Sequence, residues 1–332
     1  MSSDDPFAPS PQVLSGQTTD VYFLRTQQVL GAAGLNPIAV MEVFPSREGL
    51  LCGMREVDAL LREVLPPGAE VWALAEGKRM SAKEVVLRIK APYLSYAIYE
   101  TAILGMLAGG TGWATAAAEC VEAAAGIPVI SFGARHVHPH AAPYMDYAAV
   151  VGGCSSCSTP LGARLAGTEP SGTMPHAMII CFGDTVEAAL AFDRYVEPEV
   201  SRTVLVDTFL DEADESVRVA RALGESLQAV RLDTPSELGG VTPDLVRRVR
   251  SRLDSEGYPH VRIFVSGGMT PDRIREFQEN RALVDGYGVG SYISGARPND
   301  FTADLKEING HPVAKRGRTP GTTQNPRLQR IV

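Results

Sequence analysis

The stretch RIFVSGG, residues 262–268, shows the unit from which the fold can be predicted: a short apolar run that ends in a polar or glycine-rich tip. Runs of this kind recur along the chain, and a helix-like stretch follows most of them. The others are Val129–Phe132, Ala149–Val151, Thr203–Val206, Ala229–Leu232 and Ala282–Val284. Strands that are apolar on both faces and alternate with helices are typical of a parallel sheet covered by helices.

This alternation predicts an α/β fold whose parallel strands close into a barrel. In such a barrel the residues just past each strand meet at one mouth. The strand tips carry an arginine (Arg135), two aspartates (Asp207 and Asp233) and two glycine-rich loops. We therefore expect these groups to share one site.

The length of 332 residues suits one large α/β domain and a smaller one. We expect an N-terminal α/β (α+β) cap domain over residues 1–110 and the barrel over residues 111–300. Residues 301–332 are interpreted as a basic C-terminal tail, because His311–Val332 holds five basic residues and no acid. Three interpretations of the tail stay open: a solvated segment, a segment that packs on the N-terminal domain, and a contact for a polyanionic ligand.

The net charge of −8 argues against a nucleic-acid-binding protein, which needs a basic footprint. Met1–Gln12 lacks the basic and apolar regions of a signal peptide. The uncharged stretch between Glu100 and Glu119 is diluted by glycine and threonine, so we interpret it as a buried helix pair and not a membrane span. Five cysteines, an odd count, fit a reducing cytosol. We expect a cytoplasmic protein with no nucleic-acid or membrane partner.

Two groups of residues could suggest a metal site. Cys154 and Cys157 form a C-x-x-C pair, but no second pair supplies the remaining zinc ligands. His136, His138 and His140 alternate, but a proline interrupts the strand that would align them. We therefore expect no metal that is held by protein ligands alone.

The two late glycine-rich loops predict a phosphate site. After Ser266-Gly267-Gly268, Thr270 is a good helix N-cap and Pro271 a good first helical residue. Glycines let the backbone approach a ligand closely, and the free N–H groups at a helix start attract an anion. Gly288 and Gly290 repeat the arrangement about twenty residues later. Late loops of this type often bind phosphate in α/β barrels.

Asp207 and Asp233 each follow an apolar strand. A carboxylate at that position can accept hydrogen bonds from ribose hydroxyls or hold water around Mg²⁺, and it can equally cap a turn. Arg231 lies two residues before Asp233, so the two side chains leave the same face of a strand. Arg231 either forms a structural ion pair or grips a ligand carboxylate with its planar fork.

Taken together, these residues resemble the nicotinate phosphoribosyltransferase family, the type II phosphoribosyltransferases. The similarity extends from about Gly16 to Arg330, and the order and spacing of the motifs carry it. The motifs are Thr19-Asp20-Val21-Tyr22, Tyr96 with Glu100 and Leu104-Gly105, Phe132-Gly133-Ala134-Arg135, Gly172-Thr173-Met174-Pro175-His176, Val206-Asp207-Thr208, Arg231-Leu232-Asp233-Thr234 and the two glycine loops.

The resemblance implies transfer of a phosphoribosyl group from phosphoribosyl pyrophosphate to nicotinate, with Mg²⁺ present and coupled to ATP hydrolysis. The products are nicotinate mononucleotide and pyrophosphate, an entry into NAD biosynthesis by salvage. It also implies an incomplete, seven-stranded α/β barrel with an N-terminal α/β domain. Family members form homodimers or larger assemblies with a shared active site, to which Tyr22 would come from the neighbouring chain.

The resemblance also assigns roles to residues around the pyridine ring. Phe132 and Tyr22 would stack on the ring, although each could instead be a plain core aromatic. Arg231, with Thr173 nearby, would bind the nicotinate carboxylate. Arg135 would lie near the ribose and the pyrophosphate.

The remaining roles concern the phosphoribosyl group. Asp207 and Asp233 would face the ribose or the metal. The loops with Ser266, Gly267, Gly268, Gly288 and Gly290 would cradle the 5′-phosphate. His176 corresponds to the histidine that ATP phosphorylates in the family, although a capping or core histidine is the alternative.

Ser158 bears on the choice of acceptor. The related nicotinamide enzymes have an aspartate at this position, and a neutral serine favours an acid over an amide. Quinolinate, with two carboxylates, would need more fixed basic groups than Arg135 and Arg231. Nicotinate is therefore the expected acceptor. The alternatives are a quinolinate or nicotinamide phosphoribosyltransferase on the same scaffold and a non-catalytic nucleotide-binding barrel.

Overall fold

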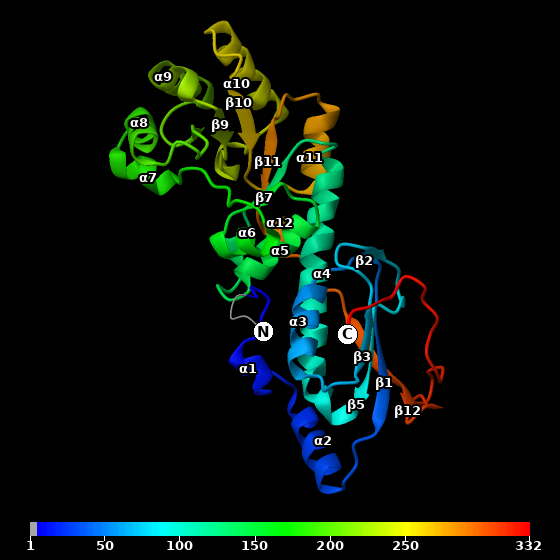
Figure 1. Cartoon of the computed structure of the whole chain (residues 1–332). Helices are drawn as coiled ribbons and strands as arrows, with labels where there is room; N and C mark the ends of the chain where they lie inside the picture. The colour runs from blue at the N-terminus through cyan, green and yellow to red at the C-terminus, as the bar shows by residue number, and fades with distance from the viewer. Residues whose placement is uncertain (1–4) are drawn as a thin grey trace. The chain divides into compact units, whose positions relative to one another are not determined.

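The computed structural model describes residues 5–332, which divide into two compact units (Figure 1). The first unit comprises the chain up to Thr115 together with Ala296–Val332, and the second is Ala116–Gly295. The chain thus leaves the first unit and returns to it. The segment 301–332, expected as a separate tail, is part of the first unit. Helix α4 (Glu100–Ala123) runs from one unit into the other.

The first unit is built on a six-stranded sheet in the order β13-β12-β1-β5-β3-β14. Its strands are β1 (Ile38–Pro45), β3 (Glu70–Ala73), β5 (Leu87–Pro92), β12 (Phe301–Ile308), β13 (His311–Pro312) and β14 (Gln329–Arg330). A separate pair is β2 (Gly49–Leu50) with β4 (Arg79–Met80). The helices are α1 (Pro11–Leu14), α2 (Val21–Ala32), α3 (Met54–Val64), and the short 3₁₀ turns η1 (Tyr93–Ser95) and η2 (Ala97–Tyr99).

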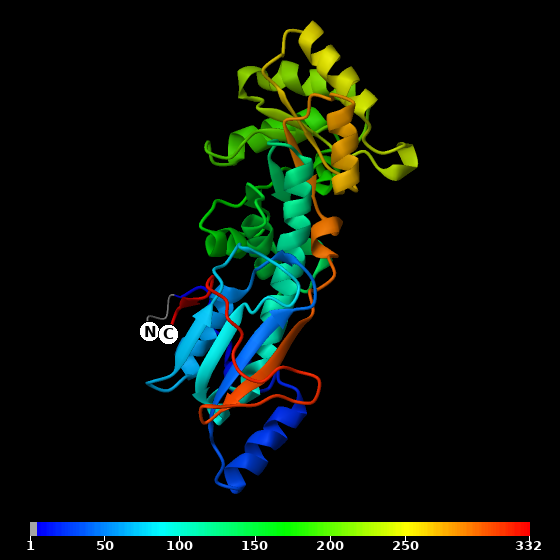
Figure 2. The same ribbon diagram turned by 90° about the vertical axis from the view of Figure 1, so that its right-hand side faces the viewer.

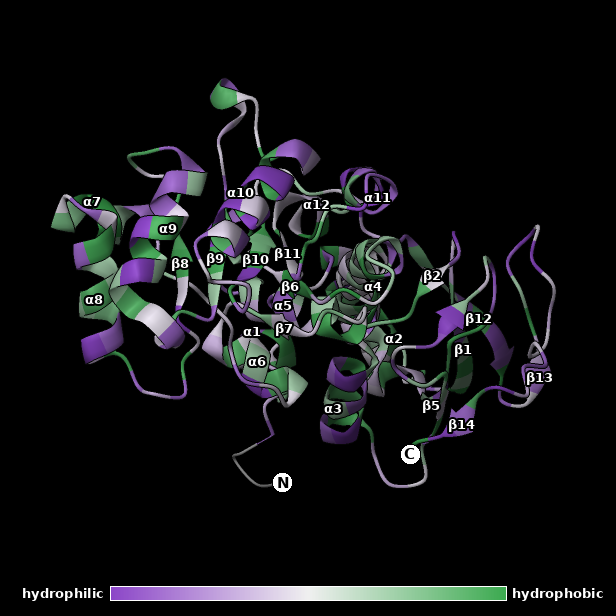
Figure 3. Cartoon of the chain, turned by 90° about the horizontal axis from the view of Figure 1, so that it is seen from above, coloured by the Kyte–Doolittle hydropathy of each residue, from purple (hydrophilic) through white to green (hydrophobic). Residues whose placement is uncertain are grey.

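Helix α3 shows why this unit folds. Met54, Val57 and Leu61 recur at helical spacing and are buried, whereas Arg55 faces solvent. Figure 3 shows the hydrophilic residues of α3 in purple beside its green apolar ones. The buried stripe belongs to the same core cluster as Met41 of β1 and neighbouring strand residues, so the sheet and the helix share one core.

The C-terminal segment completes the sheet. Strand β12 pairs antiparallel with β1, and Figure 2 shows the two side by side in orange and blue. Asp304 of β12 is buried and pairs with Lys315 at 3.1 Å and Arg318 at 2.9 Å. Arg327 pairs with Glu84 at 2.7 Å. These basic side chains therefore bind acids of their own unit, which is the packing alternative named for the tail.

We expect Glu42→Gln to lower the free energy of unfolding by about 1 kcal/mol, because charge-assisted hydrogen bonds are stronger than neutral ones. Glu42 is 1% exposed and accepts hydrogen bonds from Arg88 and from the backbone N–H of Thr323 at 3.0 Å. Urea unfolding measures the change. The matched control is Glu70→Gln, which removes a more exposed partner of Lys90 on the same sheet. Equal destabilisation by the two variants would contradict a special role of Glu42.

The second unit is a half-barrel of parallel strands in the order β7-β6-β11-β10-β9-β8. Within residues 5–332 the sheet of this half-barrel has six strands, not the seven that the resemblance implied. They are β6 (Val129–Ser131), β7 (Ser156–Cys157), β8 (Thr203–Leu205), β9 (Ala229–Leu232), β10 (Arg262–Val265) and β11 (Gly286–Val289).

Helices follow most of these strands. They are α5 (Ala142–Val151), α6 (Pro160–Ala166), α7 (His176–Phe182), α8 (Thr185–Tyr195), α9 (Glu212–Leu223), α10 (Pro243–Ser255), α11 (Pro271–Glu279) and α12 (Ser291–Ser294), with 3₁₀ turns η3 (Ala134–His136), η4 (Gly224–Ser226) and η5 (Ser236–Leu238).

Three predicted elements were wrong. Ala149–Val151 is the last turn of α5, and the strand that follows it is the short β7. Ala282–Val284 lies before β11, which begins only at Gly286. The stretch between Glu100 and Glu119 belongs to one long helix, α4, and not to a helix pair. In the described part of the chain, no helix combines the length and apolar character needed to cross a bilayer.

Candidate active site

A pocket of about 840 Å³ opens at the carboxyl ends of the parallel strands in the second unit. Most of the residues expected at the site line it: Phe132, Arg135, Ser158, Thr173, His176, Arg231, Asp233, Ser266, Gly267, Gly268, Gly288 and Gly290. Two are placed differently. Asp207 is not among the lining residues, and Tyr22 lies in the first unit, on α2, with 55% of its surface exposed.

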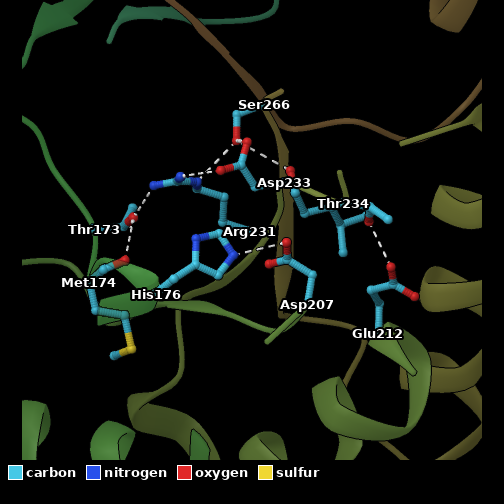
Figure 4. Close-up of polar contacts among 10 residues, drawn as sticks. Thr173, Met174, His176, Asp207, Glu212, Arg231, Asp233, Thr234 and Ser266 are labelled. Atoms are coloured by element: carbon cyan, nitrogen blue, oxygen red, sulfur yellow. Dashed lines mark hydrogen bonds and ion pairs between the residues drawn. The ribbon is translucent and has the colours of Figure 1, made fainter. Parts of the chain in front are cut away.

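Arg231 is the centre of the polar network in this pocket (Figure 4). Its guanidinium donates from Nε to Ser266 Oγ at 3.0 Å, from Nη1 to Thr173 Oγ1 at 2.5 Å and from Nη2 to Asp233 Oδ2 at 3.0 Å. Ser266 Oγ in turn donates to Asp233 Oδ1 at 2.9 Å. The ends of β9 and β10 and the loop before α7 thus hold one guanidinium in a fixed orientation, as carboxylate recognition requires.

Phe132 forms the flat wall beside this network. The guanidinium carbon of Arg231 lies 5.3 Å from the centre of the Phe132 ring. On the other side the ring rests on β11, where a Cβ on Gly288 would come within 2.4 Å of two ring carbons. Gly288 therefore seats the aromatic ring, a role that the sequence prediction of a phosphate cradle did not include.

The turn after β10 has the geometry expected of an anion site. Gly267 and Gly268 have φ angles of +83° and +64°, which favour glycine. Thr270 accepts a hydrogen bond from the backbone N–H of Arg273 at 3.2 Å and caps α11. A Cβ on Gly267 would lie 3.1 Å from Asp233 Oδ1, so the turn and that carboxylate approach closely. The pocket thus joins an arginine, an aromatic wall and a tight glycine turn at a helix start.

Asp207 faces a histidine and not the pocket. Its Oδ2 lies 3.0 Å from His176 Nε2, and the carboxyl side chain is only 1% exposed. Its Oδ1 is buried and makes no hydrogen bond within the described residues. Burial raises the pKa of Asp207, and the hydrogen bond with His176 opposes the rise. The expected contact of Asp207 with ribose or metal is therefore not supported by this arrangement; Asp207 is placed to orient His176, which lines the pocket.

We expect Asp207→Asn to lower the kcat of the phosphoribosyl transfer expected from the sequence about tenfold. The KM values for its substrates should change little, because the substitution only turns a charge-assisted hydrogen bond to His176 into a neutral one. Steady-state kinetics measure the effect. Asp193→Asn is a suitable control, since Asp193 binds Arg202 and does not line the pocket. A variant with kcat within twofold of the wild type would show that Asp207 does not act through His176.

Asp146 is a residue that the sequence analysis missed. It is fully buried on α5 and accepts hydrogen bonds from Ser131 Oγ at 2.8 Å, Ser158 Oγ at 3.2 Å and the backbone N–H of Thr159 at 2.8 Å. Ser158 and Thr159 line the pocket, so Asp146 holds that wall from behind. A lone acid in an apolar helix was the available signal. The serine at position 158 does not make this wall free of acid, because the carboxylate lies directly behind it.

The described residues contain no group of three or more His, Cys, Asp or Glu side chains placed to hold a metal ion. In the pocket, both carboxylate oxygens of Asp233 are engaged, one by Arg231 and one by Ser266. A cation in this pocket would therefore need most of its ligands from a bound substrate.

Comparison with known protein families accounts for most of the chain. Two family models match in sequence: the N-terminal domain of quinolinate phosphoribosyl transferase over residues 20–109 and its C-terminal domain over residues 113–304. The chain belongs to the quinolinate phosphoribosyltransferase family. The N-terminal model covers β1, β3 and β5 of the first-unit sheet, and the C-terminal model covers all six strands of the half-barrel.

Individual relatives are named either nicotinate-nucleotide pyrophosphorylase or nicotinate phosphoribosyltransferase. The structure of nicotinate-nucleotide pyrophosphorylase from Pyrococcus furiosus is 45% identical, with a TM-score of 0.87 over 95% of this chain and 81% of that one. Human nicotinate-nucleotide pyrophosphorylase [carboxylating] is 25% identical over 88% of this chain and 90% of its own. Nicotinate phosphoribosyltransferase pncB2 of Mycobacterium tuberculosis (strain H37Rv) is 34% identical over 68% of this chain and 48% of its own. The chain thus spans about half the length of that curated nicotinate enzyme.

The assignment to the nicotinate phosphoribosyltransferase family was therefore wrong, and so was the ATP-coupled nicotinate reaction. The matching models cover both domains as quinolinate enzymes. The short motifs did not separate the two families, as the 34% identity to a nicotinate enzyme illustrates. The charge argument against quinolinate is overruled by these matches, although Arg135 and Arg231 are the arginines that line the pocket. Because the ATP-coupled nicotinate reaction was wrong, the predicted phosphorylation of His176 by ATP is withdrawn as well.

Proposed function

We propose that this protein is a quinolinate phosphoribosyltransferase. The pyridine nitrogen of quinolinate would attack C1 of the ribose in phosphoribosyl pyrophosphate, and pyrophosphate would leave with the electron pair of the broken C–O bond. The C2 carboxylate would then leave as CO₂, and C2 would take a proton in its place. The product would be nicotinate mononucleotide, in keeping with membership of this family.

The single observation that carries the proposal is the juxtaposition of Arg231 and Phe132 with the Ser266–Gly268 turn in one pocket. A carboxylate held by the arginine and a ring held against Phe132 would place the pyridine nitrogen toward a phosphoribosyl group anchored at the turn. Fixing two reactants in line contributes roughly 7–11 kcal/mol to catalysis in favourable cases.

Two further features support this reaction. Four cationic or protonatable side chains and one acid, Asp233, are among the lining residues, a balance that suits a dicarboxylate and a pyrophosphate. Asp233 adjoins the turn, where a carboxylate would stabilise the positive charge that develops at ribose C1. Mg²⁺, carried by the pyrophosphate, would supply charge neutralisation of the leaving group.

The test is turnover by the purified protein with phosphoribosyl pyrophosphate and Mg²⁺ and, separately, quinolinate, nicotinate or nicotinamide. We expect release of pyrophosphate and CO₂ with quinolinate and no requirement for ATP. Turnover of nicotinate in preference to quinolinate would contradict the proposed acceptor. Binding of these ligands without release of pyrophosphate would contradict catalysis and favour the alternative of a non-catalytic nucleotide-binding barrel.

A homodimer or larger assembly with a shared active site, and a contribution of Tyr22 from a neighbouring copy, remain predictions. Light scattering of the purified protein tests the first. Tyr22→Ala with full activity would argue against the second.

A further inference from the structure

A second cavity, of about 220 Å³, adjoins the pocket and is lined by residues of β6, β8, β9, β10 and β11, among them the exposed Arg262. Phe132, Thr173, Arg231, Ser266 and Gly288 line both cavities, so the two cavities adjoin at these residues. We use the name inner chamber for the part bounded by Ile130, Ser201, Thr203, Arg262 and Phe264. No step of the proposed reaction uses these residues.

The strand register shows how the inner chamber is oriented. Phe264 of β10 lies opposite Arg231 of β9 and opposite Gly286 of β11. Arg262 comes two residues earlier on β10, which corresponds to about 7 Å along a strand. The inner chamber therefore extends from the arginine of the pocket toward the beginning of the strands, where a second arginine stands.

A glycine makes room for the aromatic wall of the inner chamber. A Cβ on Gly286 would lie 2.3 Å from a carbon of the Phe264 ring. The same relation holds between Gly288 and Phe132, so alternate glycines of β11 seat two aromatic rings in succession. Each cavity therefore has one aromatic ring in its wall that is seated on a glycine of β11, and Phe132 belongs to both.

The charges of the inner chamber favour an anion at its far end. The guanidinium carbon of Arg262 lies 5.8 Å from the centre of the Phe264 ring, and its Nε donates a long hydrogen bond to Gln228 O at 3.4 Å. The residues lining the cavity include Arg231 and Arg262 and no acid. Ser201 and Thr203 add two hydroxyls, whose oxygens lie 3.0 Å apart. An apolar, aromatic passage that ends at a cation suits a flat ring with an anionic tail.

We propose that the inner chamber is a binding subsite for pyridine carboxylates that bear an anionic tail at C5. This rests on the proposed function for the orientation of the ring. The nitrogen must face the ribose at the mouth, with C2 and its carboxylate beside it and the C3 carboxylate one ring position further away. C4 and C5 are then directed into the half-barrel, where a tail of a few atoms meets Arg262.

The experiment compares three ligands by calorimetry on the intact protein: quinolinate, its 5-(2-carboxyethyl) derivative and its 5-propyl derivative. We expect the carboxyethyl compound to bind at least tenfold more tightly than the propyl compound. Arg262→Met should abolish that preference and leave quinolinate turnover within twofold of the wild type. Arg275→Met, which removes an exposed arginine of α11 that binds Asp272, should retain the preference.

Three outcomes would overturn the subsite. They are tenfold weaker binding of both derivatives than of quinolinate, a preference for the charged tail that survives Arg262→Met, and no binding of any of the three. Tail-dependent binding without pyrophosphate release in the presence of phosphoribosyl pyrophosphate would support the subsite and contradict only the proposed function.

Discussion

Arg231→Met is expected to lower kcat/KM for quinolinate by roughly 10²- to 10³-fold, because truncation of a hydrogen-bonded, partly buried charge costs about 3–4 kcal/mol. The methionine removes the group placed to bind a carboxylate and leaves Asp233 without its ion-pair partner. Thr173 and Ser266 also lose the donor that ties the loop before α7 to the end of β10. Steady-state kinetics with quinolinate as the varied substrate measure the loss.

Two controls separate recognition from folding. Arg231→Lys keeps the charge without the planar fork, and we expect it to recover only part of the activity. The KM for phosphoribosyl pyrophosphate should change much less than that for quinolinate, because the glycine turn is a separate element. If Arg231→Met retains kcat/KM within about threefold, a gap of less than 1 kcal/mol, then Arg231 does not bind the acceptor.

The strands that the sequence predicted well are those with apolar residues on both faces. Thr203–Leu205 and Ala229–Leu232 are strands at or next to the predicted positions, and so is Arg262–Val265. Their side chains are largely buried, and burial on both faces removes polar residues from the pattern. Local sequence is informative where most side chains of a strand are buried.

The misplaced strands show where that signal fails. Ala149–Val151 before Gly152 looks like a strand tip, but three apolar residues followed by glycine also describe the end of a helix. Strand β11 contains Gly286 and Gly288, which have poor strand propensity, and it was assigned to a loop. Those glycines are explained only by rings from other segments, Phe264 and Phe132, which no local pattern reveals.

Pairing between strands that are far apart in the sequence explains why the segment 301–332 is part of the first unit and not a separate tail. Its basic residues suggested a tail, yet β12 lies beside β1, from which it is separated by more than 250 residues in the sequence. The acids that neutralise the segment include Glu84, far away in the chain. A charge count within one segment cannot include partners that only folding brings close.

The sequence predicted most of the residues that line the pocket, but it predicted the directions of their side chains only in part. Asp207 and Asp233 are equivalent as strand tips, yet Asp233 lines the pocket and Asp207 is turned to His176. The direction of a side chain after a strand depends on the neighbouring loop, here the one that leads into α7. The choice of acceptor failed because the short motifs that carried the resemblance do not separate the nicotinate from the quinolinate family.

The second large effect is expected for Gly288→Ala, which should lower the free energy of unfolding by about 1–3 kcal/mol and raise the KM for quinolinate by tenfold or more. The new methyl group would lie 2.4 Å from Cδ2 and Cε2 of Phe132 and 3.1 Å from Cβ of Ser266. The ring must therefore leave its seat, and with it the flat wall beside Arg231. Thermal unfolding and acceptor kinetics measure the two consequences.

A double variant tests whether the ring is the cause. Phe132→Leu removes the two clashing ring carbons, so Gly288→Ala/Phe132→Leu should recover stability relative to Gly288→Ala alone, while the KM for quinolinate stays high because the aromatic surface is missing. Gly105→Ala is the matched control, since a Cβ there meets nothing within 4 Å. Additive losses of stability in the double variant would mean that Gly288 is not needed to seat Phe132, and the phosphate cradle expected from the sequence would then be the better explanation of this glycine.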